Sequence, residues 1–369
     1  MTAFPVRTVA FYLPQFHPIP ENDAWWGKGF TEWRNVVRAR PLYPGHRQPR
    51  MPADLGFYDL RLPEIRHEQA LLARAAGIEG FCYYHYWFSG RKILERPVEE
   101  MFADPRSDLP FCLFWANERW TRTWNGKGGE VLIEQSYSAA DAEALADYLI
   151  PFFADPRYIR VDGRPVYVVY HPIHIPIWPL YAQTLRRRVA EAGMPGLYLC
   201  MVRKTHRQAD PRAFACDAAI EFPPSMGPDP AQNRKRALSE FGAAMAPDFA
   251  GELMHYGHFA RRFPQIDYAG LTVHRTVQVD YDDTARRGNA ARLYPDATPE
   301  AYARWLRATG ERTLREHAGD ARLMFLFAWN EWAEGAYLEP DLDQGTRLIE
   351  VTRAVLDGLA ALPDGQADQ

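Results

Sequence analysis

One stretch near the C-terminal end, residues 323–340, reads Leu323-Met-Phe-Leu-Phe-Ala-Trp-Asn-Glu-Trp-Ala-Glu-Gly-Ala-Tyr-Leu-Glu-Pro340. It begins with a short apolar run, Leu323 to Ala328, which is typical of a strand buried on both faces of a parallel sheet. Acidic residues follow this run directly, with aromatic residues between them. A site that cleaves a sugar needs two carboxyl groups, and aromatic faces can stack on a pyranose ring. The stretch therefore predicts a buried strand that ends in a carbohydrate site.

The remainder of the chain alternates apolar runs with amphipathic segments. The apolar runs predict strands at 6–16, 78–88, 109–120, 165–170, 197–202, 218–222 and 273–280, in addition to the one at 323–328. The amphipathic segments predict helices at 62–76, 97–102, 232–245 and 344–359, helices that begin at the cap residues Ser138 and Thr298, and one that ends at Gly193. This order of strands and helices is typical of a (β/α)8, TIM-like barrel.

Two long segments do not fit a plain turn between a strand and a helix. Residues 21–54 are polar and aromatic, and we interpret them as a structured loop. Residues 225–270 are rich in proline and charge, and we interpret them as an inserted loop. We therefore expect a barrel with extended βα loops, a single catalytic domain over residues 1–362, and a disordered tail over 363–369.

Polar side chains recur just after the predicted strands. In barrels of this kind the carboxyl ends of the strands form the active site, so these residues are expected to lie near one another. They are His17, His85, Asn117, Glu118, His171, Glu221, Asp282, Glu331 and Glu334.

Glu331 and Glu334 are the predicted catalytic pair, because two acids three positions apart on one loop can project into one cleft. The alternative is that they are acids collected at a helix N-terminus by its dipole. Glu118 has a similar setting, and its alternative role is an ion pair with Arg119 or Arg122. The predicted sugar-binding residues are Tyr12, His17, His85, Trp115, Asn117, Glu118, Trp329, Asn330 and Trp332.

Metal and phosphate motifs are weak in this sequence. The spacing of His17, His85, His171 and His174 matches no zinc motif. Two acid pairs, Asp280 with Asp282 and Asp341 with Asp343, resemble those that hold a divalent metal and a nucleotide sugar, but such pairs are common by chance. A glycine-rich turn at 126–129 lacks the spacing of a phosphate-binding loop. We expect no metal and no cofactor.

Composition limits the possible partners. The formal net charge is −4, which argues against nucleic acid or an anionic membrane as the main partner. Aromatic residues make up 14% of the chain, which suits either a tryptophan-rich core or an oligo- or polysaccharide substrate. No apolar run is long enough to span a membrane, and the N-terminus lacks a signal-peptide pattern. The four cysteines form no disulfide or zinc pattern, so we expect a cytoplasmic protein.

The element Asn330-Glu331-Trp332-Ala-Glu334-Gly335 resembles the catalytic signature of glycoside hydrolase family 99, the endo-α-mannosidases and endo-α-mannanases. A closer resemblance is to the bacterial WbsX-like relatives of that family, which are often labelled glycosyltransferases and are found with polysaccharide or O-antigen biosynthesis. Further matching motifs are Ala10–His17, Gly29–Trp33, Tyr83–Gly90, Trp115–Glu118 and Tyr281–Arg287, so the resemblance covers nearly the whole chain.

The resemblance implies a barrel and a retaining mechanism without a metal. Glu331 would act as a base on the 2-hydroxyl of the sugar, and Glu334 would protonate the leaving oxygen and later deprotonate water. The sequence departs from the endo-mannosidases at Ala333, where they typically carry histidine. Two other functions remain open, a glycosyltransferase of O-antigen or exopolysaccharide biosynthesis and a non-catalytic glycan-binding protein.

Overall fold

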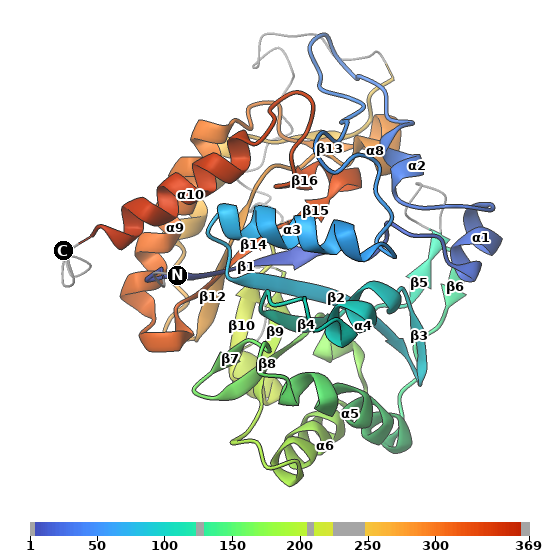
Figure 1. The fold of residues 1–369 in the computed structure, drawn as a ribbon, viewed down its shortest axis with the longest axis vertical. Helices are drawn as coiled ribbons and strands as arrows, with labels where there is room; N and C mark the ends of the chain where they lie inside the picture. Colours follow the sequence, from blue (N-terminus) through green and yellow to red (C-terminus); the bar gives the residue numbers. More distant parts are fainter. Residues whose placement is uncertain (1–3, 123–128, 205–209, 224–247, 363–369) are drawn as a thin grey trace.

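A closed barrel of parallel strands forms the centre of the molecule (Figure 1). The computed structural model describes residues 4–122, 129–204, 210–223 and 248–362. The strands pair in the order β1-β14-β12-β10-β9-β8-β4-β2, and pairing of β2 with β1 closes the ring. The predicted (β/α)8 barrel is therefore confirmed. Its strands are β1 (Arg7–Tyr12), β2 (Gly80–Phe88), β4 (Phe111–Trp115), β8 (Arg164–Val169), β9 (Tyr198–Arg203), β10 (Ala218–Glu221), β12 (Val273–Gln278) and β14 (Leu323–Phe327).

Helices surround most of this barrel. They are α3 (Pro63–Ala75), α4 (Arg96–Ala103), α5 (Ala139–Ala154), α6 (Trp178–Glu191), α7 (Tyr256–Arg262), α9 (Pro299–Glu316) and α10 (Arg347–Ala360). The predicted caps are confirmed, since Ser138 accepts from the Asp141 amide at 3.1 Å and Thr298 from the Ala301 amide at 3.2 Å. A short 3-10 turn, η3 (Pro211–Phe214), lies in the described part of the connection between β9 and β10. None of the helices in the described parts of the chain has the length and apolar character of a membrane span.

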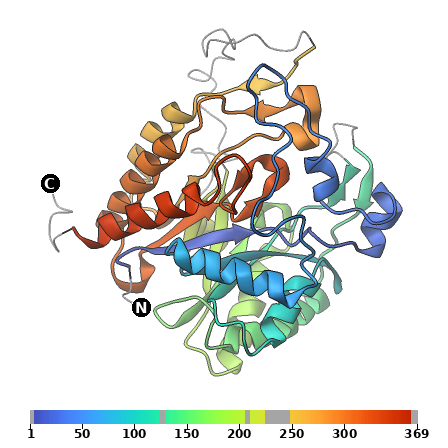
Figure 2. The ribbon, with the colours of Figure 1, turned by 45° about the horizontal axis from the view of Figure 1, so that its top comes forward.

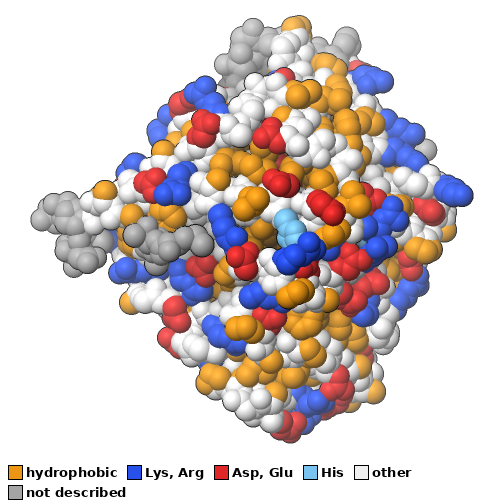
Figure 3. All heavy atoms as spheres, in the orientation of Figure 1, with side chains coloured by type: hydrophobic (Ala, Val, Ile, Leu, Met, Phe, Trp, Pro, Cys, Tyr) orange, Lys and Arg blue, Asp and Glu red, His pale blue; other side chains and the backbone are white. Residues whose placement is uncertain are grey.

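Some of the sequence predictions fall on residues whose structure is not described. The predicted helix at 232–245 and the predicted tail at 363–369 lie outside the described residues, and so does most of the glycine-rich turn at 126–129. On the face drawn in Figure 3, acidic and basic side chains are interspersed. That face carries no broad surface of a single charge.

The βα loops are long and carry structure of their own, as predicted. The loop after β1 contains α1 (Pro20–Trp26) and α2 (Trp33–Val36), and the blue segment after α2 runs beside the loop after β12 (Figures 1 and 2). A hydrogen bond of 2.7 Å from His46 to Asp282 joins these two loops. The other short elements are β3 (Arg91–Ile93), β5 (Trp120–Thr121), β6 (Val131–Ile133), β7 (Arg160–Val161), β11 (Glu252–Leu253), α8 (Thr284–Arg287), β13 (Arg292–Leu293), β15 (Asn330–Glu331) and β16 (Ala336–Tyr337).

An aromatic cluster fills the barrel axis. The ring of Phe11 lies 5.4 to 6.0 Å, centroid to centroid, from the rings of four residues that are distant in sequence, Tyr84, Phe114, Phe222 and Phe325. Such ring pairs contribute beyond the apolar area that they bury. The cluster is the floor on which the candidate site rests, because Tyr84, Phe114 and Phe222 also line the cavity described below.

β2 approaches β4 closely at Gly80, the first residue of β2, and a substitution at Gly80 tests this approach. A Cβ atom at Gly80 would lie 2.1 Å from the carbonyl oxygen of Pro110, the residue that precedes β4. We expect Gly80→Ala to push the two strands apart and to lower the free energy of unfolding by about 3 kcal/mol, measured by urea denaturation. In the matched variant Gly90→Ala, the added Cβ atom meets no atom within 4 Å. Only the left-handed φ of this position is unfavourable for alanine, so the free energy of unfolding should fall by about 1 kcal/mol. Equal losses in the two variants would contradict the close approach.

Candidate active site

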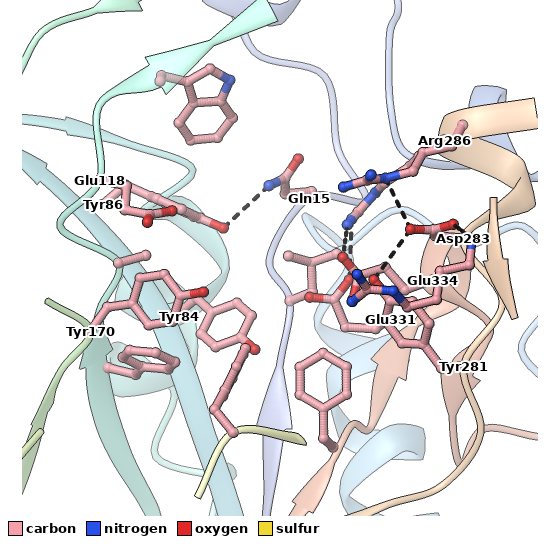
Figure 4. A pocket seen from close by; sticks show the side chains of 18 of the residues that line it. Gln15, Tyr84, Tyr86, Glu118, Tyr170, Tyr281, Asp283, Arg286, Glu331 and Glu334 are labelled. Atoms are coloured by element: carbon pink, nitrogen blue, oxygen red, sulfur yellow. Dashed lines mark hydrogen bonds and ion pairs between the residues drawn. The ribbon is translucent and has the colours of Figure 1, made fainter. Parts of the chain in front are cut away.

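A cavity of about 570 Å³ opens at the carboxyl ends of the barrel strands. In Figure 4 its two sides face each other, with Glu118 and Tyr170 on one side and Arg286, Glu331 and Glu334 on the other. Between the two sides the lining comes from β2 and from the loop after β1. The polar and aromatic lining residues are Gln15, Tyr84, Tyr86, Phe114, Glu118, Arg119, Trp120, Tyr170, Phe222, Tyr281, Asp283, Arg286, Arg287, Arg292, Phe327, Glu331 and Glu334.

The backbone after β14 turns sharply and presents both predicted catalytic acids to the cavity. Asn330 and Glu331 form β15, which pairs with β16 in a tight antiparallel hairpin. Between them, Trp332–Glu334 makes one 3-10 turn that ends at Gly335, whose φ is 62°. The alternative of acids at a helix N-terminus does not apply, because no α-helix starts there. Both glutamates line the cavity, as their spacing predicted.

One arginine joins the acid pair. Arg286, in α8, lies 3.1 Å from Glu331 between Nη2 and Oε2, and its Nη1 is hydrogen-bonded to Glu334. The same guanidinium lies 3.3 Å from Oε2 of Glu32, an acid from the long loop after β1. Three carboxylates therefore share one cation. The arginine side chain is 12% exposed, so its charge is only weakly screened by solvent.

Burial raises the pKa of both glutamates that line the cavity. Burial first, and then the charge of Glu334, raise the pKa of Glu331 above its ordinary value, while Arg286 lowers it. Burial also raises the pKa of Glu334, again against Arg286. Burial raises the pKa of Asp283 to about 6. A carboxyl group that stays protonated near neutral pH is suited to general acid catalysis.

Two predicted sugar ligands instead hold the barrel strands together. Asn330 accepts from the backbone N–H of Leu13 at 2.7 Å and donates to the Leu13 carbonyl at 3.0 Å. Asn117 makes the same pair of bonds with the backbone of His171, at 2.7 and 2.8 Å. Each amide continues the ladder between neighbouring strands where the backbone pairing ends. In both cases the next residue, Glu331 or Glu118, faces the cavity.

The other predicted sugar ligands lie behind the cavity wall, because successive residues of a strand or hairpin point to opposite sides. Tyr12 donates to Gln69 at 2.7 Å, Trp115 to the Trp87 carbonyl at 3.2 Å, and Trp332 to Glu339 at 2.6 Å. His85 is hydrogen-bonded to Tyr167 at 3.0 Å. With His17 and Trp329 these side chains are 0 to 3% exposed. None of the six lines the cavity, and the ring nitrogens of His17 and Trp329 have no hydrogen-bond partner among the described residues.

Glu118 does line the cavity, opposite the acid pair. Its carboxylate lies 3.0 Å from Nε2 of His171 and 3.4 Å from Nζ of Lys204. Glu118 therefore forms an ion pair, as the alternative expected, but its partners are not Arg119 or Arg122. Arg122 pairs with Glu130 at 2.7 Å. Glu118 is half exposed and accessible to a ligand in the cavity.

Three residues beside the cavity, Glu118, His171 and His174, have side chains that can ligate a metal ion. Ligand atoms of Glu118, His171 and His174 lie within 4.8 Å of one another, so these residues have the right chemistry for a divalent cation. The ammonium of Lys204 on the same carboxylate opposes a cation there.

The two aspartate pairs that resemble nucleotide-sugar motifs form other bonds. Asp280 pairs with Arg50 at 2.9 Å, and Asp282 accepts from His46 and Gln48, each at 2.7 Å. Asp341 accepts from the backbone amide of Asp343 at 2.9 Å. These bonds hold loops together and turn the Asp280 and Asp282 carboxylates toward the protein.

Sequence reasoning did not single out four residues that the fold brings to the site. Arg286 and Asp283 come from the loop after β12, Gln15 from the loop after β1, and Tyr84 from β2. All four lie inside motifs that carried the family resemblance, which is the only signal that pointed to them. The Tyr84 hydroxyl and the Gln15 amide oxygen are buried and have no hydrogen-bond partner among the described residues. Gln15 donates through its nitrogen to Tyr86 at 3.2 Å.

Comparison with known proteins gives a family match over most of the chain. Residues 8–352 match the family model described as glycosyltransferase WbsX. The uncharacterized protein WxcX of Xanthomonas campestris pv. campestris is 44% identical over 352 residues, which are 95% of this chain and 50% of that protein. WxcX of strain B100 matches to the same extent. The chain thus spans about half the length of the curated relatives it matches.

Solved structures share the fold. A GH99 endo-alpha-mannosidase from Bacteroides thetaiotaomicron superposes with a TM-score of 0.58 and 15% identity, covering 96% of this chain and 97% of the other. A glycoside hydrolase-like protein gives 0.60 and 13%, covering 96% and 95%. At these identities the likeness concerns the barrel and its loops.

Asn330→Ala should test whether this side chain joins β14 to β1. The change leaves the N–H and C=O of Leu13 unpaired in a fully buried place, and we expect a loss of about 2 to 4 kcal/mol in unfolding free energy. The exposed Asn289→Ala is the control and should change stability little. A urea midpoint for Asn330→Ala equal to that of the control would show that the bonds to Leu13 contribute nothing.

Proposed function

The chain belongs to the glycosyltransferase WbsX family, and on that basis we propose that it is a carbohydrate-active enzyme that cleaves a glycosidic bond in this cavity with retention. One observation carries the proposal. Glu331 and Glu334 face one cavity at the carboxyl ends of the barrel strands and share the Arg286 guanidinium. A pair of carboxyl groups at one bound saccharide is the minimum for acid-base cleavage of a glycosidic bond.

In the proposed first step, Glu331 takes the proton of the sugar 2-hydroxyl. The 2-oxygen forms a bond to the anomeric carbon while the bond from that carbon to the leaving oxygen breaks. Glu334 gives its proton to the leaving oxygen. The product is a 1,2-anhydro sugar, as the resemblance to family 99 implies, and no carboxylate attacks carbon directly. One proton moves onto Glu331 and one leaves Glu334, so the pair keeps its charge.

In the second step water opens the anhydro sugar. Glu334, now ionised, takes a proton from a water molecule while the oxygen of that water forms a bond to the anomeric carbon. The bond from that carbon to the 2-oxygen breaks, and Glu331 returns its proton to that oxygen. Two inversions at the anomeric carbon give net retention. Each glutamate ends in the protonation state in which it began.

The substrate itself would distribute the proton between the two acids. A 2-hydroxyl that donates to Glu331 favours the ionised form of that carboxyl. A glycosidic oxygen that accepts from Glu334 favours the neutral form of the other. Arg286 contacts both carboxylates and stabilises whichever one is charged, so it needs little movement between the steps.

The proposed substrate is an oligosaccharide or a bacterial polysaccharide, with endo action on an α-mannoside-like linkage as the first candidate. The cavity holds several rings, among them Trp120 and Tyr170 on the side of Glu118, that can lie against further sugar units. Ala333, where the endo-mannosidases typically carry histidine, is completely buried. Any mannose selection would have to come from other residues of the lining.

A glycosyltransferase is the second candidate, favoured by the description of the family. Formation of a glycosidic bond in the same cavity would need a nucleotide-sugar donor. Thermal shift measurements with nucleotide sugars, with and without Mn²⁺, separate the two functions. A rise in Tm that depends on the donor, without release of reducing sugar from any polysaccharide, would favour the transferase. Glycan binding with no product under either condition would favour a non-catalytic binding protein.

Glu334→Gln should remove the proton donor and keep the shape of the cavity. On a panel of bacterial polysaccharides, release of reducing sugar is expected to fall by about 10² to 10⁴-fold. An activated substrate with a good leaving group should be affected less in its first step. Glu350→Gln on the exposed side of α10 is the control, with unchanged rates expected. A wild-type rate for Glu334→Gln would refute its role as the acid.

Tyr84→Phe separates substrate binding from stability. Its hydroxyl has no partner among the described residues, so removing it breaks no hydrogen bond seen in the structure and Tm should stay the same or rise. Affinity for a saccharide that accepts from this hydroxyl should fall by about 2- to 10-fold, measured by titration calorimetry.

Tyr158→Phe is the matched control for Tyr84→Phe. It loses bonds to the Leu113 amide at 3.0 Å and the Val166 carbonyl at 2.9 Å, so Tm should fall while affinity is unchanged. If both variants change affinity equally, Tyr84 has no specific contact with the sugar.

A further inference from the structure

Glu32 is a buried acid beside the Glu331 and Glu334 pair that the proposed mechanism does not use. It precedes α2 in the loop after β1 and is 0% exposed. Its Oε2 atom lies 3.3 Å from both Nε and Nη2 of Arg286. Its Oε1 atom is buried and has no hydrogen-bond partner among the described residues. An ionised carboxylate that is removed from water and only half paired is costly, so a purely structural role accounts poorly for an acid at this position.

Charge around Arg286 is unbalanced. Glu32, Glu331 and Glu334 would carry three negative charges if all were ionised, against one positive charge on the guanidinium. Burial would lower the pKa of Arg286, but the charges of Glu32, Glu334 and Glu331 raise it well above its ordinary value, so the cation persists. Protonation of one glutamate is the least costly way to reduce the excess.

Other charged and titratable groups surround the cluster from each element packed on it. Arg287, Arg292 and Asp283 come from the loop after β12, and the hydroxyls of Tyr84 and Tyr86 from β2, with that of Tyr281 after β12. Asp283 is itself paired with Arg287 at 3.0 Å, and Arg292 with Glu252 at 3.1 Å. Arg286 is therefore the cation that directly contacts both glutamates in the described part of the chain.

We propose that Glu32 is a positioning residue that fixes the Arg286 guanidinium between Glu331 and Glu334 and, as a third negative charge on that cation, keeps one proton on the glutamate pair. The proposal depends on the proposed function only for the use of that proton. The loop after β1 thus sets the protonation of acids that follow β14. Glu32 touches Arg286 and acts through it, without reaching the cavity lining.

The pH dependence of stability tests this inference without a substrate. Burial and like charge raise the pKa of Glu331 and Glu334 in the folded protein above the ordinary value of 4.5. Their contribution to stability is therefore complete below that pH and is lost as the pH rises through the raised values. Glu32→Gln removes one repelling charge, so Tm should fall less between pH 6 and pH 9 than in the wild type, by about 2 to 4 °C.

A matched control comes from the opposite end of the barrel. Arg7 and Glu79 form a partly buried pair at 2.6 Å with a single carboxylate on the guanidinium. Glu79→Gln should lower Tm by the same amount at every pH in this range and leave the slope as in the wild type. Other buried acids with a raised pKa, such as Glu221 and Glu339, contribute equally to all the variants and cancel in the comparison.

A slope in Glu32→Gln equal to that of the wild type would overturn the inference. If this variant does not fold, Glu32→Asp withdraws the charge from Arg286 and should change the slope in the same direction by less. An unchanged slope in Glu32→Asp with a lower Tm would mean that the role is steric only, which also overturns it. Because these readouts need no saccharide, they can fail while the Glu334→Gln experiment succeeds, and the reverse.

With a cleaved saccharide in hand, the pH profile of the reaction gives a second readout. Loss of the Glu32 charge should move the alkaline limb of activity to lower pH by about one unit. A change in rate at all pH values without movement of that limb would contradict a role in holding the proton.

Discussion

Closure of the barrel is the constraint on which the rest of the structure depends. β1 pairs with β14 on one side and with β2 on the other, so the first strand of the barrel becomes the neighbour of the last barrel strand. Asn330 extends this seam beyond the backbone ladder by bonding both polar groups of Leu13. Closure leaves the loops after β1, β12 and β14 at the same end of the barrel, where Glu32, Arg286 and Glu331 meet.

The acid pair is held in a setting that differs from an ordinary surface ion pair. Arg286 and the carboxylates around it are mostly shielded from solvent, so their interaction is only weakly screened and each group affects the protonation of the others. Three acids repel one another around one arginine, so negative charge exceeds positive charge when all of them are ionised. A site in this condition responds to small changes, such as a sugar hydroxyl arriving at Glu331. Proton transfer at a glycosidic bond requires such a response.

The same cavity serves the two candidate functions differently. Hydrolysis needs only the acid pair, water and a bound saccharide, all of which a cavity of about 570 Å³ can hold together. Transfer from a nucleotide sugar needs a place for a diphosphate as well. Asp280 and Asp282, one of the two pairs that resemble a donor motif, are bonded to His46, Gln48 and Arg50, and these bonds hold the loop after β1 against the loop after β12. That arrangement favours the hydrolase proposal, while the description of the family keeps the transferase in view.

The sequence by itself determined the barrel and the location of the acids. Buried strands of a parallel sheet have apolar sequences, and helices often begin at capping residues. Local patterns were therefore enough to predict β14 and the helix starts at Ser138 and Thr298. The 331/334 spacing placed two acids on one turn, and both line the cavity, although their catalytic role stays a prediction.

Only the tertiary structure decided which side chains face that cavity and which face the wall. Asn330 and Trp332 flank Glu331 in sequence, yet Asn330 bonds the backbone of Leu13, just after β1, and Trp332 bonds Glu339. A hairpin turns successive residues to opposite sides, so both point away from the side that Glu331 faces. The partnership of Arg286 with Glu32 joins positions 254 residues apart. No local pattern encodes such a pair, since it exists only where closure of the barrel brings separate loops together.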